Sequence, residues 1–400
     1  MKIVFINRYF YPDHSATSQL LSDLVFYLSA KGSEVHVITS RQRYGDAGAA
    51  LPVTETIRDV NVHRIWSSRF GRYNLLGRAC DYLTFYMSAL VFLAWTLKKE
   101  DQVISMTDPP MMSVVSAVVA RCYGSRTINW IQDLFPETAT ILKVRGTGGF
   151  TDRFLRGLRN WSLSVADLNV VIGRRMMDRL IAEKIKPERI HLIPNWADGE
   201  HIRPLAKGSS SLVKDWGVGG KFVFAYWGNM GRAHEFRTVI DAAEKLMGES
   251  RLLFLFIGDG PEKIRTEAEF KRRGLNNVLF KPYQPYPLFS ESLCIADLQF
   301  VSLKPELEGC VLPSKFYAVL AAGRPVIYIG DPEGDIGEVL MRQNCGFTIR
   351  PGDHKELSEK IVSLMNDKVL AEKMGRNARE VFDLQFDKHY GLEEWQKILK

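Results

Sequence analysis

The stretch at 306–315 combines acidic residues, a glycine and a lysine at the start of a predicted helix. Pro313 and Ser314 are residue types that commonly open a helix, and Lys315 falls in its first turn. The free N–H groups and positive dipole end of a helix favour an anion, and the lysine adds a full charge. The sequence therefore predicts a phosphate-binding site, with a surface helix whose lysine faces water as the alternative.

Polar residues also follow two strand-like segments in the first half of the chain. Asp133 and Glu137 come directly after the apolar run at 128–132. In a doubly wound sheet, residues at the carboxyl ends of parallel strands face the ligand cleft. Both acids also suit helix capping, so a structural role stays open. The loop at 9–18 follows the first strand, and His14 is either a ligand contact there or an ordinary turn residue.

Glycine-bearing turns end two strand-like segments of the second half, at 222–227 and 252–257. Glycine allows the backbone to approach a phosphate closely, although a single G-D-G turn also serves simply to join a strand to a helix. The candidate ligand contacts on these turns are Gly228, Asn229, Gly231, Arg232, Gly258, Asp259 and Gly260.

Taken together and in this order, the motifs resemble the family 4 glycosyltransferases of GT-B architecture, and within them the bacterial exopolysaccharide and O-antigen branch. The donor-binding run E-G-x-x-x-P-S-K-x-Y matches 308–317, and A-A-G-R-P follows at 321–325. The other matching segments are IQDLFPE at 131–137, LIPNWAD at 192–198, WGNMGRAHEF at 227–236, FIGDGPE at 256–262 and FKPYQP at 280–285.

The resemblance implies a role for each group. It makes Asp133 an acceptor-side group or general base with Glu137 in support, and it makes Glu308 the acid nearest the donor sugar. It puts the nucleotide base near Tyr283. Ala318 stands where we expect the second glutamate of the family's E-x7-E pair, so the residue that holds the ribose stays open. The remaining donor-binding residues implied in this way are Gly309, Ser314 and Lys315.

The chain departs from the family at the donor diphosphate. Many members carry an arginine directly after the first glycine of the 227–236 turn and a lysine five residues later, and these bases hold the diphosphate. Here Asn229 and His234 stand at those two positions. The residues that we expect to hold the phosphates instead are Arg232, Ser314 and Lys315.

The elements that carry these motifs alternate between strand and helix along the whole chain, and the alternation restarts after a polar stretch at 195–211. This predicts two doubly wound Rossmann-like α/β domains facing a cleft, which is the GT-B plan. We expect an acceptor-side domain at 1–203, a nucleotide-sugar donor domain at 204–384, and, as the resemblance implies, a C-terminal helix at 385–400 that packs back on the first domain. Residues 40–60 are expected to form a loop.

Composition restricts the class of protein and its partners. The 400 residues are 46% hydrophobic and 25% charged, as in folded soluble proteins, and the net charge of +7 suits an anionic partner. The bases form no clusters and no nucleic-acid motif appears, so a nucleic-acid-binding protein is only a distant alternative. Five scattered cysteines and no signal peptide indicate a cytoplasmic protein. No DxD motif or His/Cys cluster is present, and we expect no metal and no cofactor.

Residues 82–97 form an uncharged apolar segment flanked by bases. It is too short for the roughly 20 residues that span a bilayer. Arg72 and Arg78 precede it, and Lys98 and Lys99 follow it, where they can meet anionic lipid headgroups. A core helix of the first domain and a helix at an anionic membrane surface are both open interpretations.

These expectations define a glycosyltransferase. It would move a sugar from a nucleotide-sugar donor, UDP before GDP, to a saccharide on a polyprenyl diphosphate lipid, with retention of anomeric configuration. The enzyme would be cytoplasmic and peripheral on the inner face of the cell membrane. A GT-B nucleotide-sugar epimerase is the alternative enzyme.

Overall fold

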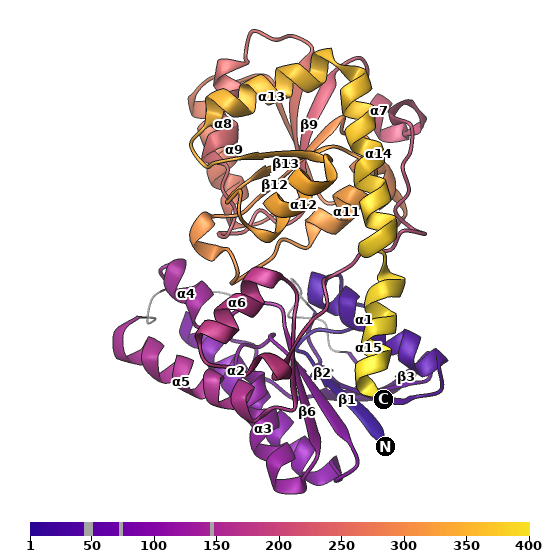
Figure 1. The fold of residues 1–400 in the computed structure, drawn as a ribbon, viewed down its shortest axis with the longest axis vertical. Coiled ribbons are helices and arrows are strands. Elements are labelled where there is room, and N and C mark those ends of the chain that lie inside the picture. Colours follow the sequence, from indigo (N-terminus) through magenta and orange to yellow (C-terminus); the bar gives the residue numbers. More distant parts are fainter. Residues whose placement is uncertain (44–50, 72–74, 145–147) are drawn as a thin grey trace. The chain divides into compact units, whose positions relative to one another are not determined.

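The computed structural model describes residues 1–43, 51–71, 75–144 and 148–400, so Arg72 lies outside the described residues. The chain forms two compact units. The first unit comprises Met1–Pro194, Gly309–Val311 and Leu392–Lys400, and the second comprises Asn195–Glu308 and Leu312–Gly391. Each unit is built on one sheet covered by helices (Figure 1).

The first unit contains an eight-stranded sheet in the order β3-β4-β2-β1-β5-β6-β7-β8. Every neighbouring pair is parallel except β3 and β4. The strands are β1 (Lys2–Ile6), β2 (Glu34–Ser40), β3 (Thr54–Ile57), β4 (Val60–Ile65), β5 (Gln102–Met106), β6 (Arg126–Ile131), β7 (Leu168–Val171) and β8 (Ile190–Leu192).

The edge strand β3 corrects the prediction of a loop throughout 40–60. Its residues alternate between exposed and half-buried, so its apolar signal is weak. Arg58 and Asp59 both have positive φ, 48° and 62°, and form a two-residue hairpin turn to β4. Neither is a glycine, which hides the turn in the sequence.

Helices cover the sheet of the first unit. Within it, α3 packs against both α2 and α5 (Figure 1). The C-terminal return implied by the resemblance is present, because Trp395 is fully buried with its ring centroid 4.7 Å from that of Trp130. The helices are α1 (Ala16–Ala30), α2 (Leu75–Thr96), α3 (Met112–Tyr123), α4 (Glu137–Ile141), α5 (Gly149–Val165) and α6 (Arg174–Ala182), and the last residues of α15 (Lys388–Leu399).

The second unit contains a fully parallel six-stranded sheet in the order β11-β10-β9-β12-β13-β14. Its strands are almost continuously apolar, as expected when helices cover both faces. They are β9 (Phe222–Trp227), β10 (Leu252–Ile257), β11 (Val278–Lys281), β12 (Leu298–Ser302), β13 (Val326–Ile329) and β14 (Gly346–Ile349).

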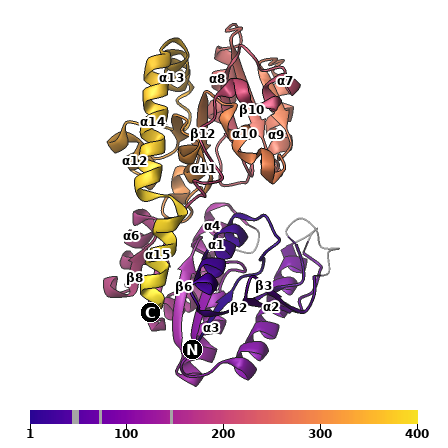
Figure 2. The same cartoon turned by 90° about the vertical axis from the view of Figure 1, so that its right-hand side faces the viewer.

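The helices of the second unit include two close pairs, because α13 packs against α8 and α11 packs against α14 (Figure 2). They are α7 (Ser211–Asp215), α8 (Arg237–Lys245), α9 (Pro261–Arg272), α10 (Phe289–Cys294), α11 (Lys315–Ala321), α12 (Asp335–Gln343), α13 (His354–Asn366) and α14 (Lys368–Gln385).

The boundary between the units falls after Pro194 rather than after residue 203. The polar stretch at 195–204 has the composition of a linker, but the second unit satisfies its polar groups. Gly199 N–H donates to Asp387 Oδ2 at 3.1 Å, and Arg203 N–H donates to Ser290 Oγ at 3.2 Å. At the other end, the second unit continues to Gly391 rather than residue 384.

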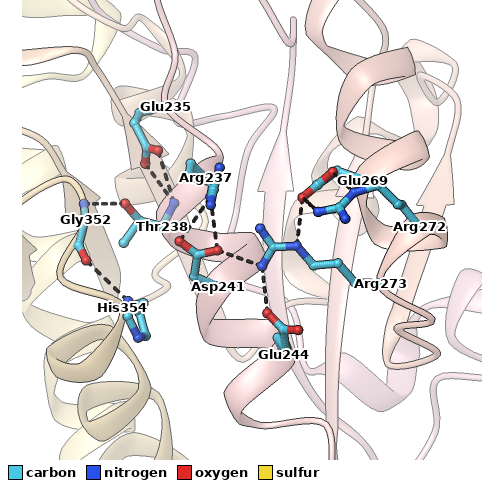
Figure 3. Close-up of polar contacts among 10 residues, drawn as sticks. All are labelled: Glu235, Arg237, Thr238, Asp241, Glu244, Glu269, Arg272, Arg273, Gly352 and His354. Atoms are coloured by element: carbon cyan, nitrogen blue, oxygen red, sulfur yellow. Dashed lines mark hydrogen bonds and ion pairs between the residues drawn. The ribbon is translucent and has the colours of Figure 1, made fainter.

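A network of charged side chains fixes α8 beside α9 (Figure 3). Arg273 donates to Asp241 and Glu244 at 2.7 Å and to Glu269 at 2.8 Å. At the start of α8, the Glu235 carboxylate accepts the Thr238 N–H at 3.1 Å. The network therefore holds the helix that follows the 227–236 turn.

Candidate functional site

The turn after β9 lies tightly against the end of β10. Gly228 N–H donates to Ile257 O at 2.9 Å. A Cβ on Gly258 would lie 2.1 Å from Gly228 O, and a Cβ on Gly260 would lie 2.5 Å from Asn229 Oδ1. Both glycines have φ near 140°, at 143° and 139°, where other residues are strained. These predicted glycines are therefore required for the backbone to pack at this strand end.

The first residue of α11 sends its side chain into the same turn. Lys315 Nζ donates to Asn229 O at 3.2 Å and lies 3.0 Å from His234 Nε2, and it also hydrogen-bonds Tyr226 Oη. The ammonium lies 4.1 Å from the centroid of the Tyr226 ring. A Cβ on Gly228 would lie 3.3 Å from Lys315 Cε. The structure thus joins the predicted lysine to the predicted glycine turn.

Hydrogen bonding determines which nitrogen of His234 carries the proton. Its Nδ1 lies 2.6 Å from Ser302 O, and a carbonyl can only accept, so Nδ1 is the donor. The neutral ring then accepts at Nε2 from Lys315. Desolvation, followed by the charge of Lys315, lowers the pKa of His234 well below its usual range. His234 is therefore a neutral acceptor.

The cation in this turn is half-buried and has only neutral partners among the atoms that hydrogen-bond it. Desolvation lowers the pKa of Lys315 well below its usual range. The residue as a whole keeps partial exposure. An anion that reached the ammonium would supply the counter-charge that its hydrogen-bonding partners lack.

Ser314 contributes differently from our expectation. We expected it to open α11 as a cap, but its backbone is already helical, with φ −61° and ψ −24°, and its side chain makes no capping hydrogen bond. A capping side chain needs an extended backbone to fold back over the first turn. Ser314 is half-buried next to Lys315.

Glu308 is held at the start of another helix of the second unit. Its carboxylate accepts the Tyr328 O–H at 2.9 Å and the Asp335 N–H at 3.0 Å, the latter at the first residue of α12. Desolvation raises the pKa of Glu308. The carboxylate thus stabilises the amino-terminal end of α12, and contact with a donor sugar stays a prediction.

The remaining donor-site candidates lie at three places. Arg232 and Asp259 are exposed on the two glycine turns. The Tyr283 ring is 45% exposed, with its centroid 5.7 Å from that of Trp227. Gly309 belongs to the first unit, where a Cβ on it would lie 2.8 Å from Arg175 O.

The segment Gly309–Val311 pairs with the residues that follow β6 in the first unit. Val311 forms an isolated antiparallel bridge with Asp133, and Cys310 O accepts the Leu134 N–H at 2.8 Å. The E-G-x-x-x-P and D-L-F-P-E motifs are therefore joined through the backbone, a relationship that neither motif reveals alone.

Asp133 lies at the carboxyl end of β6, as predicted. Its side chain is exposed and borders a small cavity of about 30 Å³. Desolvation by the surrounding protein, followed by the charge of Asp108, raises the pKa of Asp133. Desolvation raises the pKa of Asp108 to about 6, against the opposing effect of Arg8. We did not select Asp108 from the sequence, although it follows β5 just as Asp133 follows β6.

Among the described residues, Glu137 and His14 make no hydrogen bond or ion pair with Asp133. Glu137 is buried, and its Oε1 lies 2.6 Å from Arg159 Nη2 and 3.3 Å from Arg156 Nη1. His14 is exposed on the turn before α1. The first unit thus presents a pair of carboxyl groups, Asp108 and Asp133, that can accept a proton near neutral pH.

Comparison with known proteins gives two family matches. The glycosyl transferase 4-like domain matches residues 17–196, and the glycosyl transferases group 1 model matches residues 212–381. The chain is 24% identical to the putative colanic acid biosynthesis glycosyl transferase WcaI of Escherichia coli K12 over 406 residues, which cover 99% of this chain and 98% of that protein. It is 25% identical to the probable glycosyltransferase WbjE of Pseudomonas aeruginosa over 359 residues, 88% of this chain and 87% of that protein.

The fold is also similar to that of a solved structure. Anabaena HepE in complex with UDP-glucose superposes with a TM-score of 0.74 at 16% identity, covering 100% of this chain and 99% of HepE. At this level of identity the likeness supports the fold alone.

Proposed function

The chain belongs to the family 4 glycosyltransferases of GT-B architecture and acts in polysaccharide biosynthesis, and from this premise we propose its donor and acceptor. The donor is a nucleotide-sugar, with UDP before GDP as the nucleotide. The acceptor is a saccharide carried on polyprenyl diphosphate, and the sugar is transferred with retention of configuration.

The half-buried Lys315 ammonium at the glycine turn carries this proposal. The leaving nucleoside diphosphate gains negative charge as the glycosidic bond breaks, and a fixed cation in a partly dry site stabilises that charge. Gly228, Gly258 and Gly260 let the two turns and the Lys315 side chain approach one another closely, which holds the ammonium at the strand ends. HepE, which shares the fold, is solved in complex with UDP-glucose, and we propose UDP for this chain by analogy with it. We propose that transfer needs no metal ion, because Lys315 supplies the charge.

Asp133 is the proposed proton acceptor for the acceptor hydroxyl. It lies in the first unit, at the carboxyl end of β6, with a raised pKa and partial access to solvent. A carboxylate whose pKa is closer to neutrality is a better general base than an ordinary exposed aspartate. Asp108 is its electrostatic neighbour.

We also propose that the enzyme is peripheral on the inner face of the membrane, because α2 has two different apolar faces. Phe85, Ala89 and Leu93 are fully buried in the core of the first unit. On the opposite face, Met87 is 62% exposed and Trp95 is 87% exposed. Residues 76–96 are long and apolar enough to cross a bilayer, but the packed inner face favours a helix that lies on the membrane surface.

A second helix of the first unit supports the membrane proposal. On α5, Phe150 and Phe154 are one turn apart and 82% and 56% exposed, and Trp161 continues the same side at 38%. Arg153 is exposed between the two phenylalanines. Exposed aromatics interleaved with a base are typical of helices at an anionic lipid surface.

Transfer assays with defined substrates test the proposed function. The purified protein is incubated with single UDP- or GDP-sugars, with and without a polyprenyl-diphosphate saccharide, in EDTA. Nucleotide release that depends on the lipid-linked acceptor is the expected result. Equal release without any acceptor, or transfer only after a divalent metal is added, would contradict the acceptor or the metal-free mechanism, respectively.

A further inference from the structure

Lys315 contacts both positions at which this chain lacks the family's diphosphate bases. Many members carry an arginine at the position of Asn229 and a lysine at that of His234. In this structure, the Lys315 ammonium hydrogen-bonds the Asn229 carbonyl at 3.2 Å and lies 3.0 Å from His234 Nε2. Lys315 belongs to α11 and follows His234 by 81 residues. Its ammonium thus supplies one positive charge beside Asn229 and His234, where many family members have an arginine and a lysine.

We propose that Lys315 is the relocated diphosphate cation of this enzyme and that His234 and Tyr226 are the residues that position it. The inference rests on the proposed nucleotide-sugar function and goes beyond it. It gives His234 and Tyr226 the role of orienting the Lys315 ammonium. It also states that a lysine at position 234 and a lysine at position 315 are alternative ways to supply the same charge.

The two positioning residues are themselves fixed by the sheet. His234 Nδ1 donates to Ser302 O at the end of β12, which orients Nε2 towards the lysine. The Tyr226 hydroxyl donates to Asn229 O at 2.6 Å, so its lone pairs face the ammonium. Three acceptors thus meet the three N–H groups of Lys315 and hold the charge beside Gly228 without neutralising it.

This geometry disfavours a second permanent positive charge at position 234. A lysine there would place a second ammonium close to the first, and like charges in a half-buried turn repel. The proposal therefore predicts an unusual pattern: a lysine at 234 is harmful while Lys315 is present and beneficial once Lys315 is removed.

Binding of UDP, uridine and inorganic diphosphate by calorimetry tests the pattern in four proteins: wild type, Lys315→Met, His234→Lys and the double variant. Lys315→Met should weaken UDP and diphosphate about 10- to 150-fold, as expected for one charge-assisted hydrogen bond, and leave uridine unchanged. His234→Lys alone should also weaken both anions. The double variant should bind both anions at least tenfold more tightly than Lys315→Met.

Lys271→Met is the matched control, because it removes an exposed lysine of α9. It should leave the affinities for UDP, uridine and diphosphate unchanged.

The positioning role has its own readout. His234→Ala should weaken UDP but not uridine, and His234→Gln, whose amide oxygen can accept from Lys315, should recover part of that loss. Equal losses for UDP and uridine, or no recovery in the double variant with its fold intact by melting, would overturn the inference. A wild type that binds inorganic diphosphate with this pattern, but no UDP or GDP, would contradict the proposed donor and leave the relocated cation supported. Absence of any diphosphate binding would overturn both.

Discussion

Arg159 Nη2 lies 2.6 Å from Glu137 Oε1 in the interior of the first unit, where both residues are less than 10% exposed. Arg156 Nη1 approaches the same oxygen at 3.3 Å. The pair joins α4 to α5 and leaves Glu137 Oε2 and Arg159 Nη1 without a hydrogen-bond partner among the described residues. A buried ion pair with unsatisfied atoms contributes little net stability, but the loss of one partner strands a charge.

Glu137→Ala should therefore lower the free energy of unfolding by about 3–5 kcal/mol, because Arg159 would be left buried and unpaired. Denaturant titration measures the change. Replacing both residues by leucine should recover part of the loss. A Glu137→Ala variant with unchanged stability but no glycosyl transfer would contradict this structural role and support the catalytic role that the resemblance implies.

Asp133→Asn should lower transfer about a hundredfold or more while nucleotide binding persists, because the amide keeps the shape and removes the proton acceptor. A general base acts in its deprotonated form, and the pKa of Asp133 is raised. The wild-type rate should therefore fall as the pH drops through this raised value. Single-turnover rates between pH 5 and 8 and calorimetry with UDP check both parts. Unchanged turnover would remove Asp133 from the mechanism.

The raised pKa of Asp108 should make the stability of the fold fall as the pH rises. A carboxylate in an ordinary salt bridge has the opposite effect, because its pKa is lowered. The pKa of Asp108 rises to about 6 in the folded state, from about 4 in an unfolded chain, so the folded state binds the proton more tightly. Stability should then fall as the pH rises from about 4 to 6, and the full cost remains above pH 6.

Asp108→Asn should remove this cost. We expect about 1–3 kcal/mol of added stability at pH 8, a range reduced because the side chain keeps some solvent contact, and no difference at pH 4. Denaturation at a series of pH values measures the difference. A variant less stable than wild type at pH 8 would show that the attraction of the Asp108 carboxylate to Arg8 outweighs its desolvation.

The local patterns of the sequence were sufficient for the strand ends and their glycines. Gly258 and Gly260 could be selected because a parallel strand followed by a glycine turn fixes both the conformation and the edge of the sheet. The same rule applied to the strand at 103–107 would have found Asp108. The doubly wound α/β class followed from the alternation, whereas the returning C-terminal helix was expected only from the resemblance. Strand β3 was missed because an exposed edge strand carries little apolar signal.

The contacts of the site depend on long-range topology, which the sequence does not display. Lys315 meets His234 because β12 lies beside β9 in the sheet and carries the Ser302 carbonyl that orients the histidine. The ion pair of Glu137 with Arg159, which lies 22 positions away on another helix, is likewise invisible in the sequence. A polar residue that binds a ligand and one that forms an internal ion pair cannot be distinguished in the sequence until their partners are known.

Membrane binding should depend on the outer sides of α2 and α5. We expect the protein to float with liposomes that contain phosphatidylglycerol, less at high salt, since surface charges are screened over about 8 Å at physiological ionic strength. Val91→Ser with Trp95→Ser, and Phe150→Ser with Phe154→Ser, should each reduce flotation. Ile264→Ser with Met341→Ser, which removes equally exposed residues of the second unit, is the control. Binding that survives both test pairs, or a change in oligomeric state instead, would contradict the proposal.

Glu308 offers a test that separates a structural from a catalytic carboxylate. In the structure its two oxygens accept from the Tyr328 O–H and the Asp335 N–H. Glu308→Gln keeps an oxygen for Asp335, and its amide can donate to the Tyr328 oxygen, so the fold should change by less than about 1.5 kcal/mol. Glu308→Ala leaves the Tyr328 O–H and the Asp335 N–H without their acceptor and should lower the free energy of unfolding by about 2–4 kcal/mol.

If Glu308 also contacts the donor sugar, as the resemblance implies, Glu308→Gln should reduce turnover at least tenfold with unchanged UDP affinity. The charge beside the sugar is then removed while the diphosphate site is intact. Turnover within twofold of wild type in a folded Glu308→Gln protein would leave this residue with the stabilisation of α12 as its whole role.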